Sequence, residues 1–422
     1  MIFLIKNANV VLDNDIKRLD ILIKDGIVEN LGTNLKYFGA RTVDAENLTA
    51  IPGIVDMHVH FRDPGFCQKE DIKTGSEAAA AGGITSVACM PNTSPAIDSA
   101  EILRYIKEKS SKAKVKIYPI AAITKGLLGK ELVDFEELIA NGAVGFSDDG
   151  RPVENAALLQ LAMEKLEKLG FPIISHCEDL NIVGQGVVNK GKISKKLDAP
   201  GIDRTSEDSI TAREIAIAAA TNSSVHIAHV STFGSVDLIR DAKKRGVKLS
   251  AETCPHYFML TEEELLKKDA DYRMNPPLRT EKDRAAVEGA LIDGTIDLVA
   301  TDHAPHTRGE KANFLTAPNG VVGLETSLAC VLTHFYHTKK LTLPEIVEKM
   351  SRNPCKILKI EGGKIQKGSP ADLALVDLNQ KWTVNPEKFR SKGKNSPFKG
   401  KTLTGKVVKT FCDGKLIFDA LS

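Results

Sequence analysis

The sequence predicts an α/β protein: a (β/α)8 TIM barrel with a small β-sandwich domain built from both ends of the chain. Three observations lead to this fold class. The 422 residues exceed the roughly 250–300 residues over which a single hydrophobic core grows. The middle of the chain alternates short apolar strands with amphipathic helical stretches, a pattern typical of parallel sheets. Both ends show the apolar–polar alternation that is typical of strands alone.

The two ends of the chain share the same turn chemistry as well as the same alternation. Asp25-Gly26 lies between two apolar runs near the N-terminus, and Asp413-Gly414 lies between two similar runs near the C-terminus. Asp-Gly pairs favour the tight turns of β-hairpins. We therefore expect residues 1–50 and 363–422 to form the two parts of the sandwich, and residues 51–362 to form the barrel.

The middle of the chain contains eight candidate strands, at residues 51–60, 84–92, 115–124, 142–150, 171–179, 224–231, 248–257 and 297–306. Helical periodicity between them is found in Glu101–Lys109, Asn155–Leu169, Ser206–Thr221, Gly234–Arg245 and Glu281–Leu291. Eight strand–helix units in about 300 residues match the size of a TIM barrel, which usually needs about 250 residues or more.

Composition excludes several classes of protein. The net charge of +2 gives no sign of nucleic-acid or membrane binding. Lysines 392, 394, 399 and 401 are read as a solvated surface, because glycines and a proline interrupt them. No apolar run reaches the ~20 residues of a membrane helix, and the N-terminus reads as a strand and not as a signal peptide. The seven scattered cysteines indicate reduced thiols, so we expect a cytoplasmic protein.

Polar side chains stand where the candidate strands end. His58 and His60 end the first strand, and a spacing of two residues places both on the same face. The other strand ends carry Asp148 and Asp149 (fourth), His176 (fifth), His229 (sixth) and Asp302 (eighth). These ends converge on the active-site face of a TIM barrel. Four histidines with carboxylates suit Zn²⁺, so we expect a zinc site, whereas His226 and His334 read as structural residues.

Longer runs around these residues resemble known motifs. IPGIVDMHVHFRDPG at residues 51–65 resembles the amidohydrolase signature, and ATDHAPHTRGEK at residues 300–311 resembles the second signature of the dihydroorotases. The other matching motifs are MPNT at Met90–Thr93, FSDDG at Phe146–Gly150, SHCED at Ser175–Asp179, IAHVST at Ile227–Thr232 and MNPPLR at Met274–Arg279. The resemblance covers essentially the whole chain. The combination is similar to the type I dihydroorotases, in the branch that also contains allantoinases and hydantoinases.

The fourth strand discriminates within this branch. Hydantoinases and allantoinases typically have a carboxylated lysine there, bridging two zinc ions, whereas type I dihydroorotases commonly have an aspartate. This chain offers Asp148 and Asp149. We take Asp149 as the ligand and Asp148 as the alternative, because successive strand residues face opposite ways. The number of zinc ions, one or two, stays open. Cys177 reads as a small core residue, with zinc ligation as the alternative.

The resemblance also implies a substrate and a reaction. The family cyclises N-carbamoyl-L-aspartate reversibly to L-dihydroorotate in pyrimidine biosynthesis, and its substrate contacts correspond here to Arg62, Asn92, Asn275 and His306. A guanidinium can pair with a carboxylate through two hydrogen bonds, although Arg62 could instead form a structural ion pair with Asp63 or Asp71. Zinc would supply hydroxide, and we expect Asp302 to transfer the proton to the leaving nitrogen.

Two alternative functions accompany this interpretation. The chain could be an allantoinase or hydantoinase, or an inactive scaffold that partners aspartate transcarbamoylase. Filled ligand positions argue against the inactive scaffold. A complex of the active enzyme with aspartate transcarbamoylase and a homo-oligomer are both compatible with the resemblance. The polar segment at residues 307–319 is either a lid over the site or an ordinary surface connection.

Overall fold

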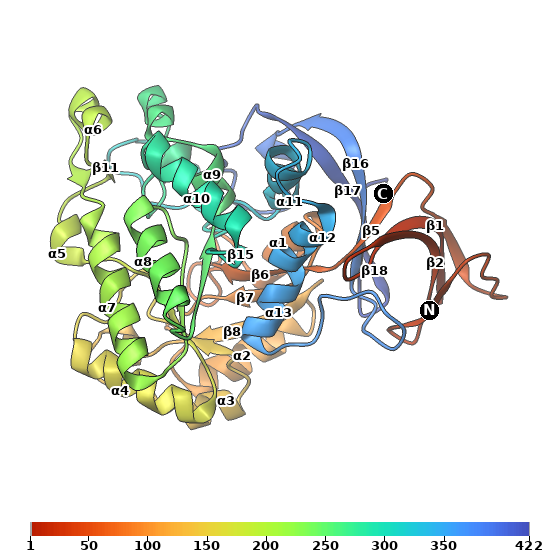
Figure 1. Ribbon diagram of the computed structural model, residues 1–422, viewed down its shortest axis with the longest axis horizontal. Coiled ribbons are helices and arrows are strands. Elements are labelled where there is room, and N and C mark those ends of the chain that lie inside the picture. The colour runs from red at the N-terminus through yellow and green to blue at the C-terminus, as the bar shows by residue number, and fades with distance from the viewer. Residues whose placement is uncertain (1, 422) are drawn as a thin grey trace.

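Two eight-stranded sheets form the framework of the described part of the chain. The structure is a computed structural model that describes residues 2–421. One sheet forms a barrel surrounded by helices, and the other gathers strands from both ends of the chain beside the barrel (Figure 1). The predicted fold class is therefore confirmed. No helix in the described part of the chain is long and apolar enough to cross a membrane.

The barrel sheet consists of parallel strands that follow one another in chain order. They are β6 (Ile54–Val59), β7 (Ile84–Cys89), β8 (Lys116–Ala121), β9 (Gly145–Phe146), β10 (Ile173–Ser175), β13 (Val225–Ile227), β14 (Leu249–Thr253) and β15 (Leu298–Val299). The first and last strands meet just beyond β15, where the His60 N–H donates to the His303 carbonyl at 2.8 Å. This contact nearly closes the barrel, so its strand ends face one common space.

Helices cover the outside of the barrel, and the five predicted ones form within two residues of their expected ends. The helices are α1 (Ile72–Ala81), α2 (Ala100–Ser110), α3 (Phe135–Ala140), α4 (Ala156–Leu169), α5 (Leu180–Val183), α6 (Lys192–Leu197), α7 (Thr205–Thr221), α8 (Phe233–Lys244), α9 (Pro255–Met259), α10 (Glu281–Asp293), α11 (Ser327–Val331), α12 (Leu343–Val347) and α13 (Asn353–Leu358). Short 3-10 and π turns occupy Lys125–Leu127, Glu262–Lys267, Ala270–Tyr272, Leu332–Tyr336, Glu348–Arg352 and Pro386–Lys388. Strands β11 (Val188–Asn189) and β12 (Gly201–Ile202) pair outside the barrel.

Side chains at the helix ends explain where these helices begin. Asp71, Asn155, Thr232 and Thr280 each accept a hydrogen bond from a backbone N–H in the first turn of α1, α4, α8 and α10. Such caps satisfy donors that have no partner within the helix. Gly170 ends α4 in the left-handed conformation at φ 78°, which glycine adopts without steric cost. Local sequence therefore sets the lengths of the barrel helices.

The second sheet joins the two ends of the chain. Its strands are β1 (Phe3–Val11), β2 (Ile16–Lys24), β3 (Ile27–Gly32), β4 (Arg41–Asp44), β5 (Thr49–Pro52), β16 (Leu373–Thr383), β17 (Thr402–Cys412) and β18 (Lys415–Asp419). The N- and C-terminal strands meet where β5 pairs antiparallel with β16, and the rings of Phe3 and Phe411 pack edge to face at 5.1 Å. Only Gly53 separates β5 from β6. The domain boundaries near residues 50 and 363 stay a prediction.

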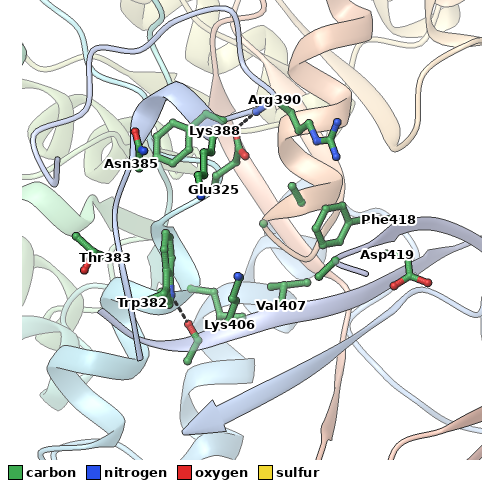
Figure 2. A pocket seen from close by; sticks show the side chains of 17 residues that line it. Glu325, Trp382, Thr383, Asn385, Lys388, Arg390, Lys406, Val407, Phe418 and Asp419 are labelled. Carbon is green, nitrogen blue, oxygen red and sulfur yellow. Dashed lines mark hydrogen bonds between the residues drawn. The ribbon is translucent and has the colours of Figure 1, made fainter. Parts of the chain in front are cut away.

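The segment between β16 and β17 returns to the barrel. There Lys392 donates to the Cys67 carbonyl at 2.7 Å, and the Asn395 side chain accepts from the His306 N–H at 3.2 Å. Behind this segment lies a cavity of about 350 Å³ between barrel helices and the terminal sheet (Figure 2). In its wall, Trp382 donates to the Gly405 carbonyl at 2.9 Å. The C-terminal part of the chain thus contributes to the barrel mouth.

Candidate metal centre and active site

Six predicted ligand residues come together at the carboxyl ends of the barrel strands. His58 lies within β6 and His60 directly after it. The others follow β9, β10, β13 and β15 within three residues of the strand end: Asp149, His176, His229 and Asp302. All six are at least nine-tenths buried. The short strands aim these side chains at one another because parallel strands end at the same face of the barrel.

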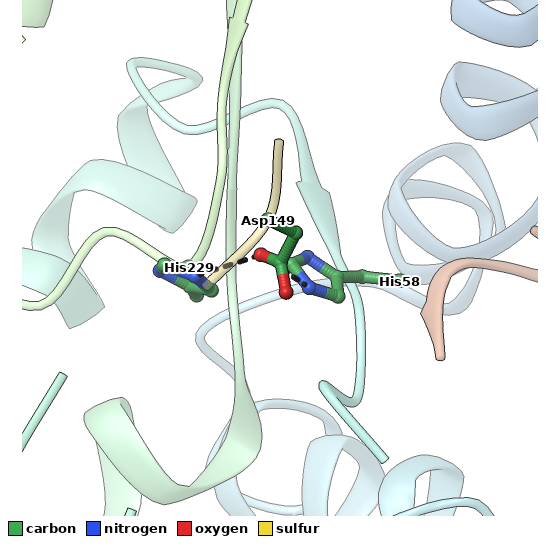
Figure 3. Close-up of side chains that lie close together, drawn as sticks. All are labelled: His58, Asp149 and His229. Atoms are coloured by element: carbon green, nitrogen blue, oxygen red, sulfur yellow. Dashed lines mark ion pairs between the residues drawn. The ribbon is translucent and has the colours of Figure 1, made fainter. Parts of the chain in front are cut away.

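Asp149 lies at the centre of this cluster. Its Oδ1 is 3.4 Å from Nε2 of His58, 3.5 Å from Nδ1 of His176 and 3.8 Å from Nε2 of His229, while its Oδ2 is 3.6 Å from Nε2 of His60. Figure 3 shows the carboxylate between His58 and His229. The two oxygens of one carboxylate therefore face two different sets of imidazoles.

Two overlapping groups of donor atoms could each hold a metal ion. One consists of His58, Asp149 and His229, and the other of His58, His60 and Asp302; the donor atoms of each group lie within 4.8 Å of one another. The His60 Nε2 is 3.0 Å from the Asp302 Oδ1. His176 adds a further nitrogen, since its Nδ1 is 2.7 Å from the His229 Nε2.

Outer partners fix which imidazole nitrogen faces the cluster. His58 Nδ1 lies 2.5 Å from the Glu252 carboxylate, and His60 Nδ1 lies 2.8 Å from the Asn92 amide oxygen. His176 Nε2 lies 3.1 Å from the Glu178 carboxylate. Each of these nitrogens must carry a hydrogen, because its partner is only an acceptor. When each ring is neutral, its opposite nitrogen has the lone pair that metal binding requires and faces the cluster.

The donor set fits a divalent cation. Nε2 of His58 and Oδ1 of Asp149 are buried without a hydrogen-bond partner, which is costly unless another group compensates them. Burial alone would raise the pKa of Asp149, but His176, His229 and His58 lower that pKa well below its usual value. The carboxylate is therefore ionised and available as a ligand. Imidazole nitrogens with carboxylate oxygens are ligands that Zn²⁺ accepts.

Asp148 faces away from the cluster. Its Oδ1 accepts the N–H groups of Ile123 at 2.7 Å and Thr124 at 3.1 Å, and its Oδ2 accepts the Thr124 hydroxyl. These bonds tie the segment after β9 to the segment after β8. The alternation of neighbouring residues thus gives Asp148 a structural position and directs Asp149 into the cluster.

The Cys177 thiol also points away from the metal donors. Its sulfur lies 3.8 Å from the Ser175 carbonyl and 3.7 Å from the Ser175 hydroxyl. Burial, with a further contribution from the Glu214 carboxylate, raises the pKa of this thiol far above its usual value. A neutral buried thiol agrees with the reading of Cys177 as a core residue.

A cavity of about 230 Å³ opens above the cluster. The four predicted substrate residues all line it: Arg62, Asn92, Asn275 and His306. Neither expected acid pairs with Arg62 in the structure. Asp63 instead accepts the Tyr105 hydroxyl at 2.8 Å, and Asp71 pairs with Lys392. The Arg62 Nε is buried without a hydrogen-bond partner, so the guanidinium is available to an anion in the cavity.

Two side chains in the cavity have fixed hydrogen-bonding roles. The Asn275 amide donates to the Glu178 carboxylate at 2.9 Å, and its Oδ1 is buried without a partner. His306 Nε2 must donate to the Asn319 carbonyl at 2.9 Å. Burial, helped by the nearby Arg62 cation, lowers the pKa of His306 to about 3, so its Nδ1 is an acceptor. Asn275 Oδ1 is therefore a free acceptor for an N–H group, whereas His306 Nδ1 is an acceptor that also lies 3.4 Å from the Lys69 ammonium.

Three residues of the site have left-handed backbone conformations. The φ angle is 60° at Arg62, 34° at His229 and 47° at Asp302. Residues other than glycine rarely adopt a positive φ, although Asn and Asp do so more often than the rest. Such strain is found where a functional constraint outweighs the local preference.

Sequence reasoning missed the acids behind the ligands. Glu252 holds His58 and also lies 3.2 Å from Nε2 of His226, which was read as structural. Glu178 joins His176 to Asn275. A glutamate inside a candidate barrel strand, as in KLSAETC at residues 248–254, was the available signal for Glu252.

Comparison with known proteins shows the family of this chain. The amidohydrolase family model matches residues 49–417. The barrel and its buried His–Asp cluster define a metal-dependent hydrolase, and the chain belongs to the amidohydrolase family. Within that family it belongs with the dihydroorotases. Curated dihydroorotases of Geobacter metallireducens (48% identity, 95% of both chains) and Pelotomaculum thermopropionicum (46% identity, 99% of this chain and 98% of the relative) are similar to it.

Solved structures of related enzymes share the whole fold. The L-hydantoinase (dihydropyrimidinase) from Arthrobacter aurescens superimposes with a TM-score of 0.89 at 27% identity, covering 99% of this chain and 96% of that one. The dihydropyrimidinase from Brevibacillus agri has a TM-score of 0.87 at 24% identity, covering 99% and 95%. These enzymes thus share the fold with this chain, but its sequence identity to the dihydroorotases is higher than its identity to them.

Proposed function

We propose that this chain catalyses the reversible, zinc-dependent cyclisation of N-carbamoyl-L-aspartate to L-dihydroorotate. One observation carries the proposal: a buried His–Asp cluster forms the floor of a cavity in which Arg62 has no partner for its Nε. A cyclic amide that bears a carboxylate matches this combination. Similarity to the curated dihydroorotases supports the same substrate.

The two donor groups share His58, but together with His176 the donor residues would be enough for two zinc ions. We assign His58, His60 and Asp302 to one ion, and His176 and His229 to the other. Asp149 would serve both ions, because its carboxylate lies between His58, His176 and His229 on one side and His60 on the other. When bound, zinc polarises a carbonyl oxygen and makes hydroxide available near neutral pH.

The protein residues orient the substrate. The Arg62 guanidinium pairs with the substrate carboxylate, because its planar fork fits two carboxylate oxygens. Asn275 Oδ1 and His306 Nδ1 accept N–H groups of the ring. Asn92 is less available, since its amide also donates to Asp149 at 3.2 Å. These contacts place the ring amide over the cluster.

Asp302 moves the proton. Burial would raise its pKa, but His60 and its neighbours lower that pKa to about 2, so the carboxylate is ionised and accepts the proton that the attacking water releases. It then returns the proton to the ring nitrogen as the amide bond breaks. Positioned proton transfer of this kind contributes ~10²–10⁴-fold.

Two assays test the proposal. The purified, zinc-loaded chain should hydrolyse dihydroorotate and cyclise N-carbamoyl-L-aspartate, with little activity on hydantoin or allantoin. Preference for either of the latter substrates would favour the hydantoinase or allantoinase alternative. Asp302→Asn should retain some metal and lose nearly all turnover; near-normal turnover would remove Asp302 from its role. A cytoplasmic location, a homo-oligomer and a complex with aspartate transcarbamoylase stay predictions.

A further inference from the structure

One wall of the cavity is formed by the segment that follows the eighth strand. His306, Asn319 and Gly320 line the cavity at the two ends of this segment. Between them, the side chain of Lys311 turns inward. Its ammonium donates to the carbonyls of Arg273 at 3.1 Å, Pro318 at 3.0 Å and Gly320 at 2.9 Å. An ammonium has three N–H donors, so all of them are used on backbone oxygens.

Arg273 ties the same segment from the other side. Its guanidinium donates to the carbonyls of Phe314 and Leu315 at 2.8 Å each, and to the Asn319 side chain at 3.0 Å. The Arg273 carbonyl, in turn, accepts the Gly320 N–H at 3.0 Å. Lys311 therefore links the carbonyl of Arg273 to the C-terminal end of the turn that the Arg273 guanidinium holds. The two cations form one clamp.

The clamp reaches the cavity through two backbone groups. The Asn319 carbonyl accepts the His306 Nε2 hydrogen at 2.9 Å. Gly320 has φ +141°, and a Cβ there would lie 2.6 Å from the Ala304 carbonyl and 3.0 Å from the His306 ring. The backbone at Gly320 is thus packed directly on the His306 side chain. A shift of Asn319 or Gly320 would change both the position and the hydrogen bonding of His306.

We propose that Lys311 is a positioning residue: by tying Arg273, Pro318 and Gly320 together, it fixes the wall of the cavity and holds His306 where it meets the substrate. The proposal rests on the proposed function of the cavity, but its structural part concerns only residues 307–320. Lys311 itself does not line the cavity, so its effect passes through Asn319 and Gly320.

The charge on Lys311 gives the clamp a pH dependence. Burial lowers the pKa of this ammonium to about 7. Asp271, Asp269 and Glu310 face it and favour the charge, while Arg273 opposes the charge. As the pH rises through about 7, the amine keeps two N–H donors for three carbonyls, and the wall loosens. The Michaelis constant of the wild-type enzyme should therefore rise above pH 7.

The experiment compares Lys311→Met and Lys311→Arg with the wild-type, zinc-loaded enzyme. Arg308→Met is the matched control, because Arg308 is an exposed cation of the same segment that pairs outward with Glu387. Misplacement of a binding wall can cost about 100-fold in kcat/KM. We expect Lys311→Met to show such a loss mainly in KM, with kcat changed less than about threefold. Lys311→Arg keeps its charge, so it should restore part of the affinity and remove the rise in KM above pH 7.

A second measurement follows the segment itself. Amide hydrogen exchange of residues 307–320, corrected for intrinsic rates, should become faster in Lys311→Met, and also in the wild-type chain between pH 6 and pH 8.5. Exchange in β14 should not change. This measurement stands even if Lys311→Met folds poorly, and even if the chain acts on another substrate.

Two results would overturn the proposal. If Lys311→Met and Arg308→Met lowered kcat and raised KM to the same extent, any change in the segment would have the same effect. Unchanged exchange of residues 307–320 in the wild-type chain across this pH range, together with a normal KM in Lys311→Met, would show that the wall does not depend on Lys311. An inactive wild-type chain with the expected exchange would contradict the proposed function alone.

Discussion

Nδ1 of His58 and Oε1 of Glu252 lie 2.5 Å apart, and both side chains are buried inside the barrel. The other Glu252 oxygen lies 3.2 Å from Nε2 of His226, whose Nδ1 is 2.7 Å from the Ser250 hydroxyl. This row runs from the cluster into the barrel interior along β13 and β14. Burial alone would raise the pKa of Glu252, but the two histidines lower it well below its usual value.

Glu252 should set the metal affinity of the site. The negative charge of Glu252 orients the His58 ring and raises the basicity of that ring. Glu252→Gln removes this charge. Loss of such an outer partner typically costs about 10–100-fold in metal affinity, which competition with a zinc chelator would measure. Glu214→Gln is the control, because Glu214 is also buried but contacts Ser175 and Arg213. Equal affinity in Glu252→Gln and the wild type would contradict this role.

The two neighbouring aspartates should have separable effects. Asp149→Asn places a neutral amide at the centre of the cluster, so metal analysis should show loss of at least one ion per chain. Asp148→Asn leaves the donors in place but weakens three hydrogen bonds to Ile123 and Thr124. A charged hydrogen bond contributes about 1.5–3 kcal/mol, so Asp148→Asn should lower the free energy of unfolding and retain metal. Metal loss in Asp148→Asn alone would reverse the assignment.

Much of this architecture could be predicted from the sequence because it depends on local patterns. Strand–helix alternation gave the barrel, and the polar residues at strand ends gave the ligand candidates. Asp149 could be preferred to Asp148 because neighbouring strand residues face opposite ways. The partners behind the ligands could not be found in this way. Glu252 stands 194 residues from His58 in the chain, so only the closure of the barrel brings them together.

The clamp formed by Lys311 and Arg273 could not be predicted either, because it also depends on contacts that form only on folding. A lysine in the polar segment at residues 307–319 is expected on the surface, because lysine is rarely buried without a charged partner. Lys311 is instead satisfied by backbone carbonyls, and those acceptors exist only once the segment has folded over Arg273. Composition therefore predicted a loop but gave no sign of what holds it.

Arg62 should govern substrate affinity without affecting the metal. Arg62→Lys retains a positive charge but loses the planar fork, so it is not a conservative change for carboxylate binding. We expect KM for dihydroorotate to rise by about 10–100-fold, since a charged hydrogen bond is worth about 1.5–3 kcal/mol. Metal content should stay at the wild-type level. The control is Arg151→Lys, at an exposed arginine two residues after Asp149; an unchanged KM in Arg62→Lys would remove Arg62 from the substrate site.

Glu325 should make the stability of the fold depend on pH. Its carboxylate accepts the N–H groups of Arg390 at 2.8 Å and Ser391 at 3.2 Å, in the wall of the cavity shown in Figure 2. Burial raises its pKa from 4.5 to about 7. The Glu325 carboxyl therefore ionises at a lower pH in the unfolded chain than in the folded chain. Stability from this group is fully present below pH 4.5 and is lost as the pH rises through 7.

Glu325→Gln keeps the accepting oxygen but cannot ionise, so it should escape this loss. Between pH 5.5 and pH 8, the unfolding free energy of Glu325→Gln should rise relative to the wild type by about 2 kcal/mol. Denaturant unfolding at the two pH values measures the difference, and the effects of all other groups cancel in the comparison. Glu361→Gln, at an exposed position, should differ from the wild type equally at both pH values. If Glu325→Gln behaved in the same way, the carboxyl would be ionised in the folded protein, and burial would not control its titration.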